Sequence, residues 1–359
     1  MQSARALHTA TALTNGTVLI AGGYDASESS LNSAELYDPI TGLFEATGSM
    51  ASERVAAEAV RLRGGLILMV GGQDSNGAAI ASVELYDPIT GMFSPTGPLQ
   101  TARLNPTVTR LKDGRVLVAG GYGGASGDTP LATAEIYDPK SGRFKETDAM
   151  STARRNATAT RLRDGSILVA GGYNGESVNA PEIFNPSTER FIRADDMSSA
   201  RRYPTATLLP GGEVLLAGGF ATAKGNPLNS SERFLRSGWS SLKETGRFVT
   251  SGSMATARGR HTATRLGQKS VLIAGGFDGV KPLASAELYD IASQTFSTTS
   301  TMQTPRYRHT ATPLPNGMVL IAGGADESGA LATAELFDPN TQQSGWPGGA
   351  VMLSTPAFL

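Results

Sequence analysis

Short runs of aliphatic residues alternate with polar turns along the whole chain, and the pattern repeats about every fifty residues. Each aliphatic run, such as VLIAGG at residues 18–23, ends in a pair of glycines. The pair occurs seven times, at Gly22-Gly23, Gly71-Gly72, Gly120-Gly121, Gly171-Gly172, Gly218-Gly219, Gly275-Gly276 and Gly323-Gly324. A repeat of this length with such a strand in every unit is typical of radially repeated β architectures.

Each unit predicts four short strands. A turn of the form Met-x-x-x-Arg opens the unit, and a segment such as HTATRL at residues 261–266 then alternates like a half-buried strand. A turn such as Asn15-Gly16 supplies the positive φ angles of a tight hairpin leading to the aliphatic strand. The third strand has the form SAELYDP, and Asp-Pro-x-Thr-Gly at Asp38–Gly42 turns the chain into the fourth. One aromatic residue marks each fourth strand: Phe44, Phe93, Phe144, Phe191, Phe248, Phe296 or Trp346.

Seven such units predict an all-β fold, a seven-bladed β-propeller with four antiparallel strands per blade. A single twisted sheet would not hold so many strands, and no linker interrupts the period. We therefore expect one domain over residues 1–359. Its repeats span approximately 1–49, 50–98, 99–149, 150–196, 197–253, 254–301 and 302–359.

These motifs resemble the kelch repeat, as in kelch repeat proteins of the bacterial type, and the resemblance covers essentially the whole chain. The glycine pair, the Tyr-Asp-Pro of strand three, the aromatic of strand four and the Met-x-x-x-Arg turn all match. The usual strand-four tryptophan is phenylalanine in six units, and unit five carries an insertion at Leu235–Thr245 in place of the Asp-Pro turn. A WD-repeat propeller is disfavoured because no Trp-Asp dipeptide occurs. The resemblance implies a fold related to the central domain of galactose oxidase.

Composition limits the classes of binding partner that we expect. A formal net charge of −1 argues against a general polyanion binder, so we expect no nucleic-acid partner. No stretch approaches the apolar length of a membrane helix, and no signal peptide opens the chain, so membrane insertion is not expected. The chain has no cysteine, which excludes disulfides and thiolate chemistry. We expect a monomer without a cofactor.

The two ends of the chain fall on the repeat register. Met1–Arg5 aligns with Met302–Arg306, as expected of a domain trimmed from a longer, exported or extracellular precursor. At the other end Trp346 and Met352 keep the pattern, and Pro356 takes the place of the arginine. All four strands of every blade are therefore predicted to come from one contiguous repeat. Ring closure would then depend on packing between blades seven and one.

One arginine and one glutamate recur in every unit. The arginines are Arg5, Arg54, Arg103, Arg154, Arg201, Arg258 and Arg306, and the glutamates are Glu35, Glu84, Glu135, Glu182, Glu232, Glu287 and Glu335. An active site breaks symmetry, whereas a structural pair is copied into every blade. We therefore predict structural roles, as charge-assisted Arg–Glu or Arg–backbone bonds between blades. The glycine pairs are expected to mark close backbone approach or positive φ.

Function is expected where the repeats differ. In kelch-like propellers the loops from strand two to three and from strand four to the next strand one lie on one face, around the mouth of the axial channel. Polar, basic and aromatic residues vary there, and the predicted ligand-binding residues are Arg260, Arg308, Tyr203, Phe277, Asn156 and Tyr307. Guanidinium forks bind anions and aromatic faces stack on rings, which would suit a carboxylate, an acidic peptide or a sugar. Should the strand register be shifted by one, Arg155, Arg202 and Tyr307 take their place. The alternative is an ordinary solvated rim.

The three histidines, His8, His261 and His309, share one position in the repeat. They would cluster in a closed ring, and imidazole is a common metal ligand. A hydrogen-bonding core histidine is favoured over a metal ligand because all three lie in the repeated strand pattern and no carboxylate shares their position.

Two classes of function remain open. The first is a non-catalytic binding module with a protein or glycan partner at the loop face. The second is a carbohydrate-active enzyme similar to kelch-type sugar mutarotases, which need only acid–base groups. The copper radical chemistry of galactose oxidase requires a cysteine crosslinked to a tyrosine, and this chain has no cysteine. No catalytic residue stands out in the sequence.

Overall fold

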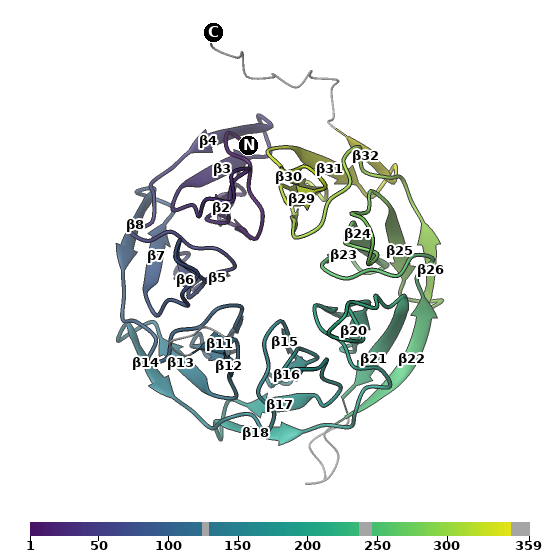
Figure 1. Ribbon diagram of the computed structural model, residues 1–359, viewed down its shortest axis with the longest axis horizontal. Coiled ribbons are helices and arrows are strands. Elements are labelled where there is room, and N and C mark those ends of the chain that lie inside the picture. The colour runs from purple at the N-terminus through teal and green to yellow at the C-terminus, as the bar shows by residue number, and fades with distance from the viewer. Residues whose placement is uncertain (124–128, 237–245, 346–359) are drawn as a thin grey trace.

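Seven antiparallel sheets of four strands form a closed ring around a central channel (Figure 1). The structure is a computed structural model that describes residues 1–123, 129–236 and 246–345. Within these ranges the chain forms strands, turns and irregular segments but no helix, and hence no helix able to cross a membrane. The predicted all-β, seven-bladed propeller is confirmed.

The strands of each blade follow one another along the chain. The first three blades contain β1 (Thr9–Ala12), β2 (Val18–Ala21), β3 (Ala34–Asp38), β4 (Leu43–Ala46); β5 (Glu58–Arg61), β6 (Ile67–Val70), β7 (Val83–Asp87), β8 (Met92–Pro95); and β9 (Thr107–Arg110), β10 (Val116–Ala119), β13 (Ala134–Asp138), β14 (Arg143–Glu146). Blades four and five contain β15 (Thr158–Arg161), β16 (Ile167–Ala170), β17 (Glu182–Asn185), β18 (Arg190–Arg193); and β19 (Thr205–Leu208), β20 (Val214–Ala217), β21 (Ser230–Leu235), β22 (Arg247–Ser253). Blades six and seven contain β23 (Thr262–Leu266), β24 (Ser270–Ala274), β25 (Ala286–Asp290), β26 (Thr295–Thr298); and β27 (Thr310–Pro313), β28 (Val319–Ala322), β31 (Ala334–Asp338), β32 (Gln343–Gly345).

In blades three and seven the loop that connects the second and third strands forms a separate two-stranded hairpin. These are β11 (Tyr122–Gly123) with β12 (Thr129–Pro130) in blade three, and β29 (Ala325–Asp326) with β30 (Gly329–Ala330) in blade seven. They extend the loop face without entering the blade sheets.

Within a blade the first strand lies next to the channel and the fourth forms the outer rim (Figure 1). The second strand is buried in every blade, apart from Ser270 at the start of β24, because both of its faces pack against neighbouring blades. Leu68 and Val70 of blade two, for example, share one apolar cluster with Val116 and Val118 of blade three. The apolar core is therefore a series of inter-blade layers rather than one central cluster.

Paired aromatic rings fill the outer part of these layers. Tyr37 of β3 lies opposite Phe44 of β4, with 4.8 Å between ring centroids. Equivalent tilted pairs occur in blades two to six at 4.8 to 5.1 Å. Such pairs add about 0.5–1.5 kcal/mol beyond area burial. Phenylalanine thus fills the position that the kelch pattern usually gives to tryptophan.

The glycine pairs mark the tightest contact between blades. Both glycines follow the second strand with positive φ, at 68° for Gly22 and 87° for Gly23. A Cβ on Gly22 would lie 2.6 Å from the carbonyl oxygen of Arg54 in the next blade, and the Gly23 N–H donates to that oxygen at 2.8 Å. In all seven blades a Cβ on the first glycine of the pair would lie 2.4 to 2.6 Å from the equivalent arginine carbonyl oxygen. Close approach and positive φ, both predicted, are confirmed.

The repeated arginines and glutamates form seven buried ion pairs, with 2.8 to 3.1 Å between Nη2 and Oε1. Arg5 also donates to the carbonyls of Gly22 and Ser33, while Glu35 accepts the backbone N–H groups of Gln2 and Ser3. Each pair therefore fastens the opening turn to its own blade, so the prediction that the Arg–Glu bonds join different blades was wrong. The connection between blades is made by the backbone of the segment that carries the arginine, as the glycine contacts show.

The ring closes with the same contacts that join its other blades. The Gly324 N–H donates to the Arg5 carbonyl at 2.8 Å, and the Arg5 N–H donates to Leu331 at 3.0 Å. The sheets of blades one and seven each come from one contiguous repeat, as predicted. Trp346, Met352 and Pro356, and most of the Leu235–Thr245 insertion, lie outside the described residues.

Candidate functional site at the channel mouth

A collar of seven residues surrounds one mouth of the channel, each two positions after a repeated arginine. All seven have left-handed backbone angles, with φ between 51° and 57°, although none is glycine: Leu7, Ala56, Asn105, Asn156, Tyr203, Arg260 and Arg308. Backbone bonds connect successive blades here, from the Arg308 N–H to the Arg260 carbonyl at 3.2 Å and from the Leu7 N–H to the Arg308 carbonyl at 3.3 Å. This conformation is unfavourable for most side chains, so the collar stores strain that the surrounding ring contacts hold in place.

The collar borders a cavity of about 330 Å³. Its lining includes Arg260, Arg308, Tyr203 and Asn156, four of the six residues predicted from the sequence. Phe277 and Tyr307 are not part of this lining; their ring centroids lie 5.6 Å apart, and the Tyr307 ring lies beside both arginines. In the structure the second residue after the repeated arginine, and not the first, lies toward the channel, which is the strand register on which the prediction was based.

Arg260 lies half-buried between two tyrosines. Its guanidinium carbon is 4.8 Å from the ring centroid of Tyr203 and 6.0 Å from that of Tyr307. Burial lowers the pKa of Arg260, the neighbouring positive charge of Arg308 lowers it further, and Tyr203 opposes the shift. Among the described residues no carboxylate forms an ion pair with this guanidinium. Arg260 therefore presents a positive charge that aromatic rings support but do not neutralise.

Arg308 on the next blade has a similar environment. Its guanidinium lies 5.2 Å from the Tyr307 ring, and Nη1 donates to the Tyr24 hydroxyl at 3.2 Å. Asn156 adds a buried amide across the mouth, and within the described part of the chain its Oδ1 has no hydrogen-bond partner. An unsatisfied buried amide is costly unless water or a ligand completes it. Two cations and one unsatisfied amide thus face the same cavity.

Glu58 is the residue that sequence reasoning did not single out. It begins β5 and lines the cavity at a position that threonine occupies in the six other blades. Its side chain is exposed to the channel, but protein walls replace much of the bulk water around it, and this desolvation raises the pKa of Glu58 to about 7. The sequence did contain a sign of this residue: when the seven units are aligned, Glu58 is the one acidic residue at a position that otherwise holds threonine.

The three histidines are buried between blades. Their Nε2 atoms lie 2.9 to 3.0 Å from the hydroxyls of Thr310, Thr205 and Thr262, each in the preceding blade. Burial, and then the positive charge of the repeated arginine, lower the pKa of His8 and of His261 to about 3, and the pKa of His309 is also far below its usual value. Neutral imidazoles therefore hydrogen-bond across three successive blade interfaces.

A second set of arginine–aromatic contacts extends from the collar over blades three to five. Arg155 lies over the ring of Tyr122 at 3.6 Å and near Tyr173 at 5.0 Å, and Arg202 lies between Tyr173 and Phe220 at 5.5 and 5.4 Å. These two arginines, the alternatives for a shifted register, do not line the cavity. They belong to the loop face around it.

The described residues do not gather into a metal site. Within residues 1–123, 129–236 and 246–345, no three histidine, aspartate, glutamate or cysteine side chains gather closely enough to hold a metal ion. The chain contains no cysteine for a copper radical centre. We therefore derive no metal chemistry for this mouth.

Comparison with known proteins agrees with the repeat structure. The Kelch motif family model matches residues 5–51, 110–151 and 154–198. No curated protein matches the sequence. Together with the seven four-stranded blades, these matches support a kelch-repeat β-propeller fold.

A solved structure has the same fold. It is described as a novel fungal alcohol oxidase with catalytic diversity among the AA5 family, in complex with copper. The TM-score is 0.76 at 16% sequence identity, and the match covers 90% of this chain and 71% of that one. At this identity the likeness concerns the fold alone.

Proposed function

We propose that the protein is a binding module that recognises an anionic sugar, such as the acidic residue of a glycan, in the cavity at the channel mouth. The observation that carries the proposal is the pair Arg260 and Arg308, two neighbouring guanidiniums without carboxylate partners among the described residues. Arginine forks match carboxylates in a bidentate geometry. A carboxylate-bearing ligand would supply the missing counter-charge.

The size and lining of the cavity favour a sugar over a broad protein surface. A volume of about 330 Å³ is at the lower end for small-molecule sites. Tyr203 lines the cavity and its ring can pack against a pyranose ring, and the Asn156 Oδ1 can accept a hydrogen bond from a sugar hydroxyl.

The test is calorimetric titration with glucuronic acid and N-acetylneuraminic acid, using glucose as the neutral control. Replacing Arg260→Ala together with Arg308→Ala should weaken binding by at least about a hundredfold, because hydrogen bonds to charged groups contribute about 1.5–3 kcal/mol each. The matched control is Arg155→Ala with Arg202→Ala, which removes the same charge from the same face outside the cavity. Loss of binding only in the control pair, or equal binding of glucose, contradicts the proposal. Binding of an acidic peptide but no sugar would replace the glycan with a protein partner.

Glu58 favours one second candidate, a sugar mutarotase-like activity in the same cavity. A carboxyl group with a pKa of about 7 can both give and take a proton at neutral pH. Exchange of sugar anomers, followed by NMR, would then be accelerated by the wild type and lost in Glu58→Gln. A binding module predicts no acceleration. It predicts instead that anion affinity rises a few-fold as the pH falls through about 7 and Glu58 loses its charge, and that Glu58→Gln removes this dependence.

A further inference from the structure

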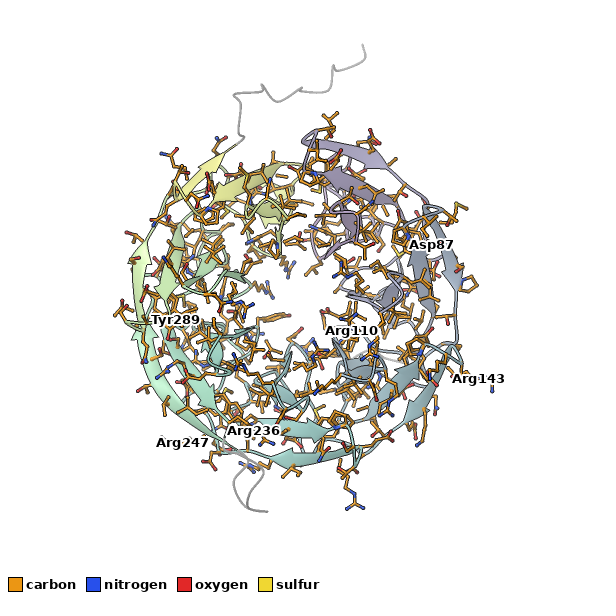
Figure 2. The ribbon with its side chains drawn as sticks, turned by 180° about the vertical axis from the view of Figure 1, so that it is seen from behind. Asp87, Arg110, Arg143, Arg236, Arg247 and Tyr289 are labelled. Carbon is orange, nitrogen blue, oxygen red and sulfur yellow. The ribbon has the colours of Figure 1, made fainter. Side chains whose placement is uncertain are left out.

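Six cationic side chains gather around the other mouth of the channel, on blades two to four. The innermost strands β5, β9 and β15 pack side by side, and each ends in an arginine, namely Arg61, Arg110 and Arg161. The turns that follow add three more cations, Arg63, Lys112 and Arg163. Five of the six line a hollow of about 680 Å³, and Figure 2 places Arg110 beside the central channel. We name these six residues the basic sector.

Neutral carbonyl groups hold the three strand-end arginines in place. The Nη1 atom of Arg61 donates to Ala12 at 3.1 Å, that of Arg110 to Arg61 at 3.0 Å, and that of Arg161 to Arg110 at 2.9 Å. Each bond reaches the carbonyl of the preceding blade, so the guanidiniums form a fixed series. Carbonyls orient a guanidinium without cancelling its charge, and a preorganised cation loses less entropy when an anion binds.

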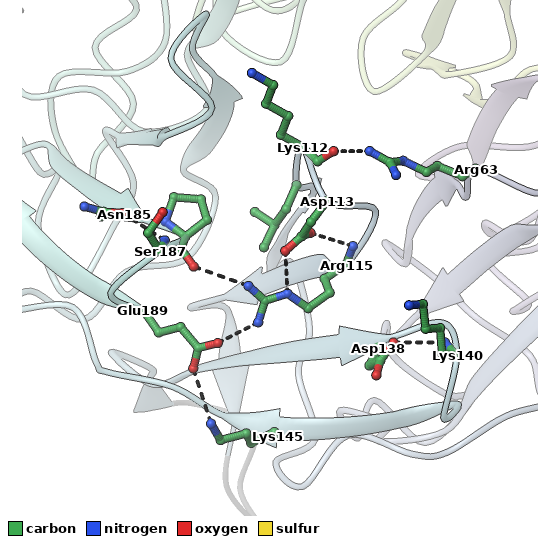
Figure 3. Close-up of polar contacts among 12 residues, drawn as sticks. Arg63, Lys112, Asp113, Arg115, Asp138, Lys140, Lys145, Asn185, Ser187 and Glu189 are labelled. Carbon is green, nitrogen blue, oxygen red and sulfur yellow. Dashed lines mark hydrogen bonds and ion pairs between the residues drawn. The ribbon is translucent and has the colours of Figure 1, made fainter.

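The carboxylates near the basic sector form ion pairs with other cations. Asp113 pairs with Arg115 at 2.7 Å, and Glu189 pairs with Arg115 and with Lys145. Asp164 pairs with Arg236 at 3.0 Å. Figure 3 shows the ion pairs around Arg115, with the Lys112 ammonium pointing away from them and the Lys112 carbonyl accepting a hydrogen bond from Arg63. In the described part of the chain, none of the six cations of the basic sector forms an ion pair.

Like charges therefore face one another across the hollow. Burial lowers the pKa of Arg110, and the charges of Arg161, Arg61 and Arg63 lower it further, the direction expected when cations repel. The equivalent strand-end positions in blades five, seven and one hold Leu208, Pro313 and Ala12, and blade six holds the single arginine Arg265, so the positive charge is concentrated on blades two to four. The chain's net charge of −1 conceals this local excess.

We propose that the basic sector is a binding site for a compact soluble molecule carrying several phosphate or sulfate groups. Three guanidiniums in series, each with N–H groups beyond the one that meets a carbonyl, match the oxygens of tetrahedral oxyanions. A single phosphate would leave most of the six charges uncompensated, which favours a multivalent ligand. The hollow spans three blades, so one small polyanion can contact arginines from each of them.

The probe is inorganic tripolyphosphate, titrated at low and at physiological salt, with inorganic phosphate for comparison. Tripolyphosphate should bind and phosphate should bind at least about tenfold more weakly, and the affinity should fall with added salt. Arg110→Gln with Arg161→Gln should weaken tripolyphosphate binding by about a hundredfold. Thermal melting of the variant checks that the propeller is folded.

The matched control is Arg265→Gln in blade six. Arg265 lies one residue before the end of the innermost strand β23 and also donates to the preceding blade, at 3.2 Å from the Leu208 carbonyl, but it does not line the hollow of the basic sector. The Arg265→Gln variant should bind tripolyphosphate like the wild type, and so should the double variant Arg260→Ala with Arg308→Ala at the opposite mouth. Absence of tripolyphosphate binding at low salt, or equal losses in Arg265→Gln and in the double variant, overturns the proposal. So does tight binding of a random single-stranded DNA oligonucleotide without binding of tripolyphosphate, which would indicate an extended polyanion instead.

Discussion

Arg258 and Arg260 are two residues apart in the chain, yet they do different things. Arg258 is fully buried, pairs with Glu287 at 2.8 Å and donates to the carbonyls of Gly275 and Ser285. Arg260 points into the channel cavity, rests against tyrosine rings and has no ion pair among the described residues. The partners of an arginine, rather than its residue type, decide whether it stabilises the fold or remains available to a ligand.

The same contrast holds for the whole ring. Residues that recur in every blade stabilise the ring: the seven Arg–Glu pairs act within a blade, and the glycine contacts join neighbouring blades. Positions that vary gather by sector, with arginines and aromatics on one arc of the loop-face mouth and the basic sector at the opposite mouth. Symmetry in the scaffold leaves the two channel mouths as the places where blades can differ without breaking the ring.

The sharpest test of this contrast is Arg258→Ala. It should lower the free energy of unfolding by about 3–5 kcal/mol, because Glu287 and several buried carbonyls lose their partner. Denaturant unfolding measures the change. Arg265→Ala is the control, since this exposed arginine should cost less than about 0.5 kcal/mol. Equal losses in both variants would remove the distinction between structural and available arginines.

A second test concerns the glycine contact between blades. Gly275→Ala would place a Cβ 2.5 Å from the Arg306 carbonyl at a φ of 61°, and should cost about 3 kcal/mol through overpacking and backbone strain. Gly317→Ala is matched to it, with a φ of 87° but no atom within 4 Å of the new Cβ, and should cost about 1 kcal/mol. If the two variants melt alike, positive φ alone explains the glycine pairs and the close approach does not matter.

The scaffold could be predicted from the sequence because its signals are copied. Seven in-phase glycine pairs, strand-three motifs and strand-four aromatics fixed the blade number and the strand order. The sequence predicted that the repeated arginines pair with the repeated glutamates, but not that Arg5 pairs with Glu35 of its own blade and fastens a turn there, since sequence spacing does not reveal which side chains meet in the ring.

The site was only partly predictable, because its residues differ from blade to blade. The varying positions identified Arg260, Arg308, Tyr203 and Asn156 as lining residues, whereas Phe277 and Tyr307 were expected there and flank the cavity. Glu58 was not predicted, because the recurring histidines one position earlier are the more evident titratable residues of this strand. The basic sector was missed although Arg61, Arg110 and Arg161 recur at the repeat interval, since only the structure brings the ends of their strands around one hollow.

The histidines fall between the repeated and the varying positions, since they recur in three blades and two of them, His261 and His309, line the cavity. An unfolded histidine titrates near 6.5, whereas His261 in the folded ring has a pKa of about 3. The unfolded chain therefore binds more protons between these values, and stability should fall as the pH drops from about 6.5 toward 3. His261→Gln should flatten this dependence by up to about 1.4 kcal/mol per pH unit, measured by urea unfolding between pH 7 and 4. An unchanged slope would mean that His261 is not held neutral.

The smallest effect is expected for Arg260→Gly, and it is the most direct counterpart of the buried arginine. Glycine relieves the strain of a φ of 55°, worth about 1 kcal/mol or more, while the lost stacking on Tyr203 and Tyr307 costs about 0.5–1 kcal/mol. These terms offset, so the free energy of unfolding should stay within about 1 kcal/mol of the wild type, against a loss of several kcal/mol for Arg258→Ala. Ala56→Gly, at the same collar position without an arginine, reports the backbone contribution alone. A large loss of stability in Arg260→Gly beyond that control would show that the collar arginine is part of the scaffold, and the comparison with Arg258 would fail.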